Sequence, residues 1–112
     1  DLGGRIKGVC KANARGCKVT VERIIYSEPV VFDASVIDLV RGAAQALDLP
    51  HMEMVSGAGH DAMHIAGLCP AGMIFVPCEK GLSHNEAESA SAPDLAAGAR
   101  VLAACLVGLA NR

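Results

Sequence analysis

The sequence has 112 residues, of which 52% are hydrophobic, 20% charged and only 3% aromatic, and its formal net charge is −2. This length allows one small packed domain, whose core has to come from alanine, glycine, valine and leucine. The balanced charge predicts no concentrated basic face of the kind that phosphate binding needs, so nucleic acid is not an expected partner.

The cysteine pattern indicates a reducing compartment. There are five cysteines, an odd number, and no two have the CxxC spacing. We therefore expect free thiols and a cytoplasmic protein. The sequence has no signal peptide and no uninterrupted apolar run of the roughly 18 residues that a membrane helix requires, so no membrane association is expected. The chain starts at Asp1 without an initiator methionine, which indicates a fragment.

The first 26 residues read as a helix followed by a strand. Residues 6–14 suit a short helix that ends at Arg15 and Gly16, where glycine can adopt the left-handed conformation. Residues 17–24 then alternate between apolar and polar, the pattern of a half-buried strand. A helix and a strand do not make a complete core. The break at residues 27–29 predicts a domain boundary, with one unit over 1–26 and another over 27–112.

The second unit alternates helices and strands. Asp33 or Ser35 can cap a helix, and apolar residues recur on one face of it from Val36 to Leu47. We expect helices over 33–47, 61–68 and 91–109, and short strands over 52–56 and 73–76. This order predicts an α/β fold with mainly parallel strands.

Two histidines follow glycine turns just after the two predicted strands of this unit. His60 comes after Gly57 and Gly59, and His84 comes after Gly81. Loops at the carboxyl ends of parallel strands carry function in α/β sheets, so both histidines can face one cleft if the strands are neighbours. His84 is either a metal ligand or an ordinary surface histidine. His60 is either a neutral hydrogen-bonding group of the site or a helix cap.

Three further patterns have competing interpretations. His60 and His64 form a helical i, i+4 pair that can bind zinc, but further ligands are lacking, so packing or exposure is favoured for His64. Cys78 lies six residues before His84, which permits a Cys/His dyad, whereas a structural thiol is the simpler interpretation. His51 is expected to be solvated.

Acidic residues near the two histidines have supporting roles in this interpretation. Asp61 can fix its loop by accepting backbone N–H bonds at a helix start. Glu86 and Glu88 either orient the imidazole of His84 or form a solvated acidic turn.

Three ordered blocks of the sequence together resemble one family. They are Ser-Gly-Ala-Gly-His-Asp-Ala at 56–62, Pro-x-Gly-Met-Ile-Phe-Val-Pro at 70–77, and Gly-x-Ser-His-Asn at 81–85 followed by Glu88. The chain resembles the zinc-dependent amidases of the hydantoinase/carbamoylase type: N-carbamoyl-L-amino-acid hydrolases, allantoate amidohydrolases and β-ureidopropionases. The likeness covers most of residues 27–112, and residues 1–26 fit more loosely as the tail of a lid or dimerisation domain.

The resemblance implies the C-terminal part of a mainly parallel-sheet catalytic domain of a metallohydrolase. Such an enzyme holds two metal ions, zinc or else Mn, Co or Ni. Metal-bound water, with a glutamate as general base, cleaves a carbamoyl or ureido C–N bond. By motif, His84 is a metal ligand, and Gly59 and His60 bind substrate, with Asp61 and Ser83 supporting the loops. A homodimer is implied.

The chain also departs from the family pattern. The family's other metal ligands, its general base and its substrate-binding arginine lie upstream of the matched region, so no catalytic residue is assigned here. Cys78 stands where a serine is common. We therefore predict that this chain is inactive alone and that its uncovered apolar surface favours self-association. Two alternatives remain: a related metal-dependent aminoacylase or carboxypeptidase, and a non-catalytic α/β binding or oligomerisation module.

Overall fold

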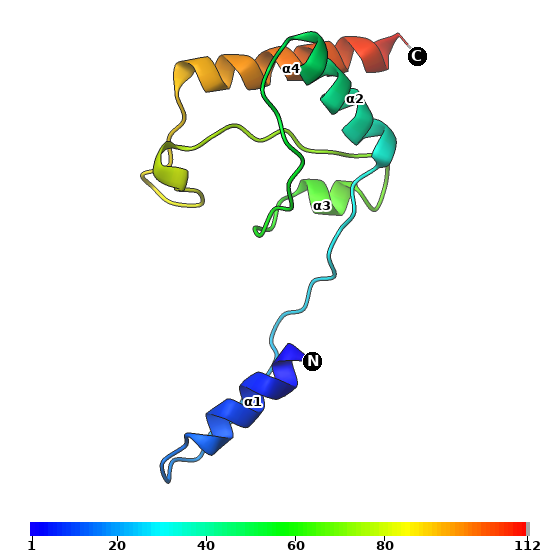
Figure 1. Ribbon diagram of the computed structural model, residues 1–112. Helices are drawn as coiled ribbons and strands as arrows, with labels where there is room; N and C mark the ends of the chain where they lie inside the picture. Colours follow the sequence, from blue (N-terminus) through cyan, green and yellow to red (C-terminus); the bar gives the residue numbers. More distant parts are fainter. Residues whose placement is uncertain (112) are drawn as a thin grey trace.

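The computed structural model describes residues 1–111 and is helical (Figure 1). Its elements are α1 (Leu2–Ala12), α2 (Ala34–Ala46), α3 (Ala62–Ile65), the 3-10 turn η1 (Glu79–Gly81) and α4 (Ala92–Ala110). α1 and the extended segment after it stand apart from the other elements, which gather around α2 and α4 (Figure 1).

The packed part of the molecule is the contact between α2 and α4. Its buried core consists of Ala44 from α2 and Val101 and Cys105 from α4. Side chains of the predicted apolar face of α2 pack against this core, which confirms that face: Leu39, Val40, Ala43 and Leu47. Small buried side chains contribute little area each, so this contact alone is a weak core.

Residues 71–76 form an extended segment that lies against both long helices. The backbone N–H of Asp33 donates to the carbonyl of Ala71 at 3.1 Å, and Ile74 packs on the core. The approach is close: a Cβ added to Gly98 of α4 would lie 2.6 Å from Cγ1 of Val76. Glycine at this position allows α4 to pack closely against segment 71–76, which precedes the loop that carries His84.

The predicted strands do not form a sheet among residues 1–111. Segments 17–24, 52–56 and 73–76 are extended, but the described residues contain no β-strand. A strand needs a neighbour to accept and donate its ladder hydrogen bonds, and none of these three segments has one within this part of the chain. The mainly parallel sheet that the strand pattern predicts is therefore not confirmed by residues 1–111.

Helix boundaries follow their capping signals closely, with two differences. Asp33 caps α2 by accepting the N–H groups of Ser35 at 2.8 Å and Val36 at 3.3 Å, and α4 begins after Ser91 as predicted. α1 begins and ends earlier than expected, because it stops at Ala12 and the left-handed turn follows it at Arg15 and Gly16. α3 is a single turn instead of the predicted 61–68.

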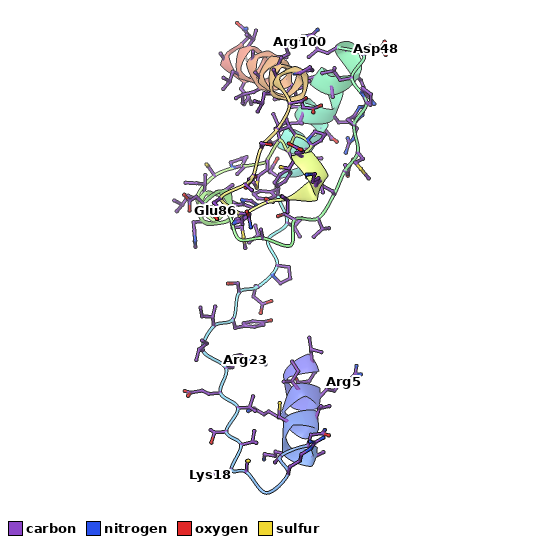
Figure 2. All side chains as sticks on the ribbon, turned by 90° about the vertical axis from the view of Figure 1, so that its left-hand side faces the viewer. Arg5, Lys18, Arg23, Asp48, Glu86 and Arg100 are labelled. Carbon is purple, nitrogen blue, oxygen red and sulfur yellow. The ribbon has the colours of Figure 1, made fainter. Side chains whose placement is uncertain are left out.

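Charge is divided unevenly between the two parts of the chain, which corrects the expectation of unclustered basic residues. Six of the ten Lys and Arg residues lie within residues 1–26. Figure 2 shows three of them, Arg5, Lys18 and Arg23, on α1 and the segment that follows it. Arg23 also lies over the ring of Tyr26, 5.2 Å from its centroid.

α4 is long and apolar enough to cross a membrane by length and composition, with a mean hydropathy of 1.5 over its 18-residue window. A search for uninterrupted apolar runs does not find this helix, because Asp94 and Arg100 interrupt it. These two charges still leave the mean hydropathy of the window high. Mostly buried core helices of soluble proteins meet the same criterion, but only 11% of this window is buried here, although α4 supplies two of the three core residues among residues 1–111.

Candidate functional site

His60 lies two residues before the first residue of α3, at the end of the glycine turn. Its Nε2 is 3.0 Å from the hydroxyl of Ser56, and its ring meets that of Phe75 edge-on at a centroid distance of 5.5 Å. The Ser56 hydroxyl also accepts the N–H of Ala58 at 3.2 Å, so one side chain holds both the turn and the imidazole. The ring of His60 is thereby fixed between a polar and an apolar contact.

His84 follows η1 on an exposed loop and lies beside His60. The two imidazole centroids are 5.6 Å apart with an interplanar angle of 60°. The main chain of His84 has φ +55°, in the left-handed region, and its N–H donates to Oε2 of Glu88 at 2.8 Å. The structure thus brings together the two histidines that the sequence places 24 residues apart, although no sheet joins their loops.

Gly59 is exposed, and a Cβ built on it would meet no atom within 4 Å. The backbone beside His60 is therefore open to close approach by a ligand. Phe75 is the neighbour of His60 that sequence reasoning missed. Its place in an apolar run indicates a core residue, yet 44% of its surface is exposed at the site.

The remaining candidates do not contact the two imidazoles. Burial raises the pKa of the Cys78 thiol, and the adjacent Glu88 carboxylate raises it further. A thiol held protonated in this way is a poor nucleophile, which favours the structural interpretation of Cys78. Asp61 makes no side-chain capping bond, so its predicted role at the start of α3 is wrong. His64 is exposed on α3, and His51 contacts the carbonyl of Leu49 at 2.9 Å.

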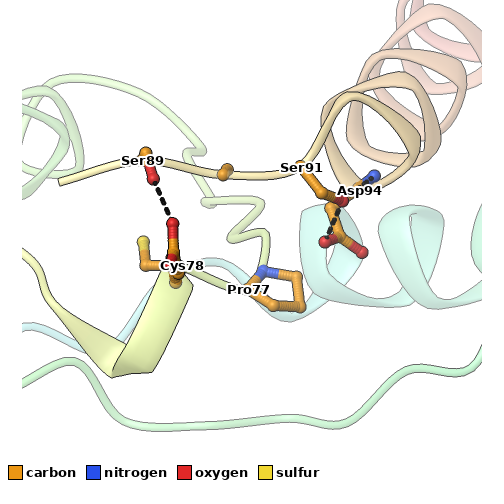
Figure 3. Close-up of a pocket in the computed structure, with 7 residues that line it drawn as sticks. Pro77, Cys78, Ser89, Ser91 and Asp94 are labelled. Atoms are coloured by element: carbon orange, nitrogen blue, oxygen red, sulfur yellow. Dashed lines mark hydrogen bonds between the residues drawn. The ribbon is translucent and has the colours of Figure 1, made fainter.

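An open pocket of about 290 Å³ lies between the start of η1 and the start of α4. Figure 3 shows its lining, including Ser89 and the pair of Ser91 and Asp94. The Ser89 hydroxyl donates to the Glu79 carboxylate at 3.1 Å. Neither His60 nor His84 lines this pocket. The pocket adjoins the loop that carries His84 but does not include either imidazole.

The donor set of this chain does not complete a metal site. Among residues 1–111, no three His, Cys, Asp or Glu side chains gather in a way that could hold a metal ion. A metal centre needs three or four protein ligands, and His84 can offer one. Residues 1–111 therefore do not form a metal centre by themselves.

Comparison with known proteins identifies the family of this chain. Residues 3–107 match the model of peptidase family M20/M25/M40. The chain is 48% identical over 94 residues to the N-carbamoyl-L-amino-acid amidohydrolase of Rhizobium meliloti, and 42% identical over 96 residues to the ureidoglycolate hydrolase of Oryza sativa subsp. japonica. These matches cover 84% and 85% of this chain, but only 22% and 20% of the relatives.

A solved structure agrees with the sequence matches. The chain is similar to an amidase of the hydantoinase/carbamoylase family from Burkholderia vietnamiensis, with a TM-score of 0.79 and 40% identity, over 92% of this chain and 25% of that one. The family model covers nearly all of the chain, so the chain belongs to peptidase family M20/M25/M40, a family of metallohydrolases. Within it, the curated relatives and this neighbour place the resemblance in the carbamoylase branch. The chain spans about a fifth of the length of these curated relatives.

Proposed function

We propose that this chain is the C-terminal segment of a metal-dependent amidohydrolase that cleaves the C–N bond of a carbamoyl or ureido group. The observation that carries the proposal is the pairing of His60 and His84 at 5.6 Å, on two loops whose sequences match the carbamoylase pattern. The names of the two curated relatives support a substrate class of N-carbamoyl amino acids or related ureido acids.

The proposed roles divide the site between substrate and metal. His84 supplies one ligand, and Gly59 and His60 hold the substrate through an open backbone and an imidazole fixed by Ser56. When bound, metal ions in such sites supply an activated water. Nothing in this segment is proposed as a catalytic residue. The metal is proposed to be zinc, with manganese, cobalt or nickel as alternatives, at two ions per complete site.

The extended segments support a sheet in the complete enzyme. We propose that segments 52–56 and 73–76 pair with strands supplied from outside residues 1–111, which would restore the mainly parallel sheet. Residues 1–26 are proposed as the tail of a lid or dimerisation domain, and 27–112 as part of the catalytic domain. The separation of α1 from α2 and α4 supports this division.

Assembly and location are proposals of the same kind. Exposed apolar side chains, such as Ile24 at 85% and Val31 at 90%, support burial against the rest of the enzyme and a partner subunit in a dimer. Five free cysteines support a cytoplasmic location.

Assay of the full-length enzyme that carries this segment tests the proposal. Initial rates are measured on N-carbamoyl-L-amino acids, allantoate, ureidoglycolate and N-acetyl-L-amino acids, before and after removal of metal by a chelator. We expect turnover of at least one carbamoyl or ureido compound, its loss on chelation and its return on adding zinc. Turnover of N-acetyl-L-amino acids alone would contradict the carbamoyl assignment and favour an aminoacylase.

A further inference from the structure

The loop that carries His84 is closed by one carboxylate. Glu88 accepts the backbone N–H of His84 through Oε2 at 2.8 Å. Its Oε1 lies 3.4 Å from the Ser83 hydroxyl and 3.5 Å from the Cys78 thiol, both of which can donate to it. Glu88 therefore links the end of the extended segment, at Cys78, to the turn at residues 83 and 84.

A short turn brings Glu88 back onto this loop. The N–H of Glu88 donates to the carbonyl of Asn85 at 2.9 Å, and the N–H of Ala87 donates to the Asn85 side-chain oxygen at 2.9 Å. These two bonds reverse the chain direction between His84 and Glu88. The spacing of four residues is therefore what allows a glutamate side chain to reach the His84 main chain.

The bond matters because His84 has an unusual backbone. Its φ of +55° lies in the left-handed region, which is uncommon for residues with a Cβ, although Arg15, Asp48 and Lys80 of this chain also adopt it. The charge-assisted bond from the His84 N–H to Glu88 favours this conformation. The direction of the Cα–Cβ bond of His84, and with it the position of the imidazole beside His60, follows from this conformation.

We propose that Glu88 is a positioning residue that holds His84 in place through its main chain and not through its ring. This inference rests on the proposed role of His84 as a metal ligand. Of the two glutamates that the sequence offers for orienting the imidazole, Glu88 takes this role. Glu86 forms no hydrogen bond with any residue in 1–111, and its side chain is exposed.

Four variants of the full-length enzyme test the proposal: E88A, E88Q, E86Q and H84A. Metal affinity is measured by competition with a chromogenic chelator, and melting temperature is recorded for each protein. E88A removes the acceptor, and loss of such a supporting partner lowers metal affinity by roughly 10- to 100-fold. E88Q keeps one acceptor oxygen, so its loss should be clearly smaller. E86Q removes the same charge two residues away and should match the wild type.

These four variants test the role of Glu88 separately from the proposed role of His84. If H84A loses metal while a folded E88A binds it as tightly as the wild type, the role of Glu88 is overturned and that of His84 stands. If H84A binds metal normally, both are overturned. An E88Q loss equal to that of E88A, or an equal loss in E86Q, would also contradict positioning through the main-chain acceptor, because charge alone would then explain the effect. If E88A does not fold, E88Q is compared with E86Q, and an affinity of E88Q equal to that of E86Q overturns the role of Glu88.

Discussion

The Ser56 side chain holds the Nε2 edge of the His60 imidazole. Its hydroxyl oxygen accepts the N–H of Ala58, which leaves the hydroxyl proton for either the Ala58 carbonyl at 3.4 Å or Nε2 of His60 at 3.0 Å. Because the hydroxyl oxygen can also accept an N–H from Nε2, this contact is compatible with either tautomer of the ring, and in both of them Ser56 holds the Nε2 edge of His60.

Removal of the Ser56 hydroxyl should therefore weaken substrate binding in the full-length enzyme. We expect S56A to lower kcat/KM roughly five-fold, the equivalent of about one neutral hydrogen bond, with most of the change in KM. Steady-state kinetics on the best carbamoyl or ureido substrate measure this. S27A, a change in the exposed linker, is the control and should have wild-type kinetics. A change confined to kcat would contradict a role of Ser56 in holding a substrate-binding group.

Among the elements, α4 packs tightly against the extended segment 71–76 at Gly98. The Cβ introduced by G98A would lie 2.6 Å from Cγ1 of Val76, a β-branched side chain with little freedom to move. Overpacking of this kind costs about 1–3 kcal/mol, and the better helix propensity of alanine offsets about 1 kcal/mol. We expect a net loss of up to about 2 kcal/mol in the free energy of unfolding.

Urea denaturation of G98A in the full-length enzyme tests this, with G42A as the matched control. Gly42 lies in α2 with nothing within 4 Å of an added Cβ, so G42A should stabilise the protein by about 0.5–1 kcal/mol. If G98A is stabilised as much as G42A, the tight contact between α4 and Val76 is refuted.

The helices could be predicted from the sequence because their signals are local. The Asp33 and Ser91 caps, and the apolar face of α2, depend on residues within a few positions of one another. The sheet could not be settled in the same way, because a strand is completed only by hydrogen bonds to another strand. The short α3 shows the same limit: its sequence suits a longer helix, but it ends after one turn.

The site was predictable in part for a related reason. Glycine turns and loop positions pointed to His60 and His84, and the motif assigned them separate roles. Their contact with each other depends on how two distant loops fold, which spacing does not determine. The hydrogen bond from the His84 N–H to Glu88 could not be predicted either, because the sequence indicates only that a carboxylate lies nearby.

The whole molecule has the dimensions of an incomplete domain. Its radius of gyration is 19.7 Å, and its extents are 64 × 32 × 20 Å. A compact domain of this length would have a radius of about 13 Å. The buried hydrophobic core among residues 1–111 contains only Ala44, Val101 and Cys105. These three small side chains make a weak core, and many large hydrophobic side chains of the described residues stay exposed.

The most direct measurement of this account is ammonia release from an N-carbamoyl-L-amino acid by the purified 112-residue chain in the presence of zinc. The same substrate and conditions are applied to the full-length enzyme at equal molarity. The account predicts turnover by the full-length enzyme and none above the buffer rate by the isolated chain, because one histidine cannot complete a metal site. Zinc-dependent turnover by the isolated chain would contradict it.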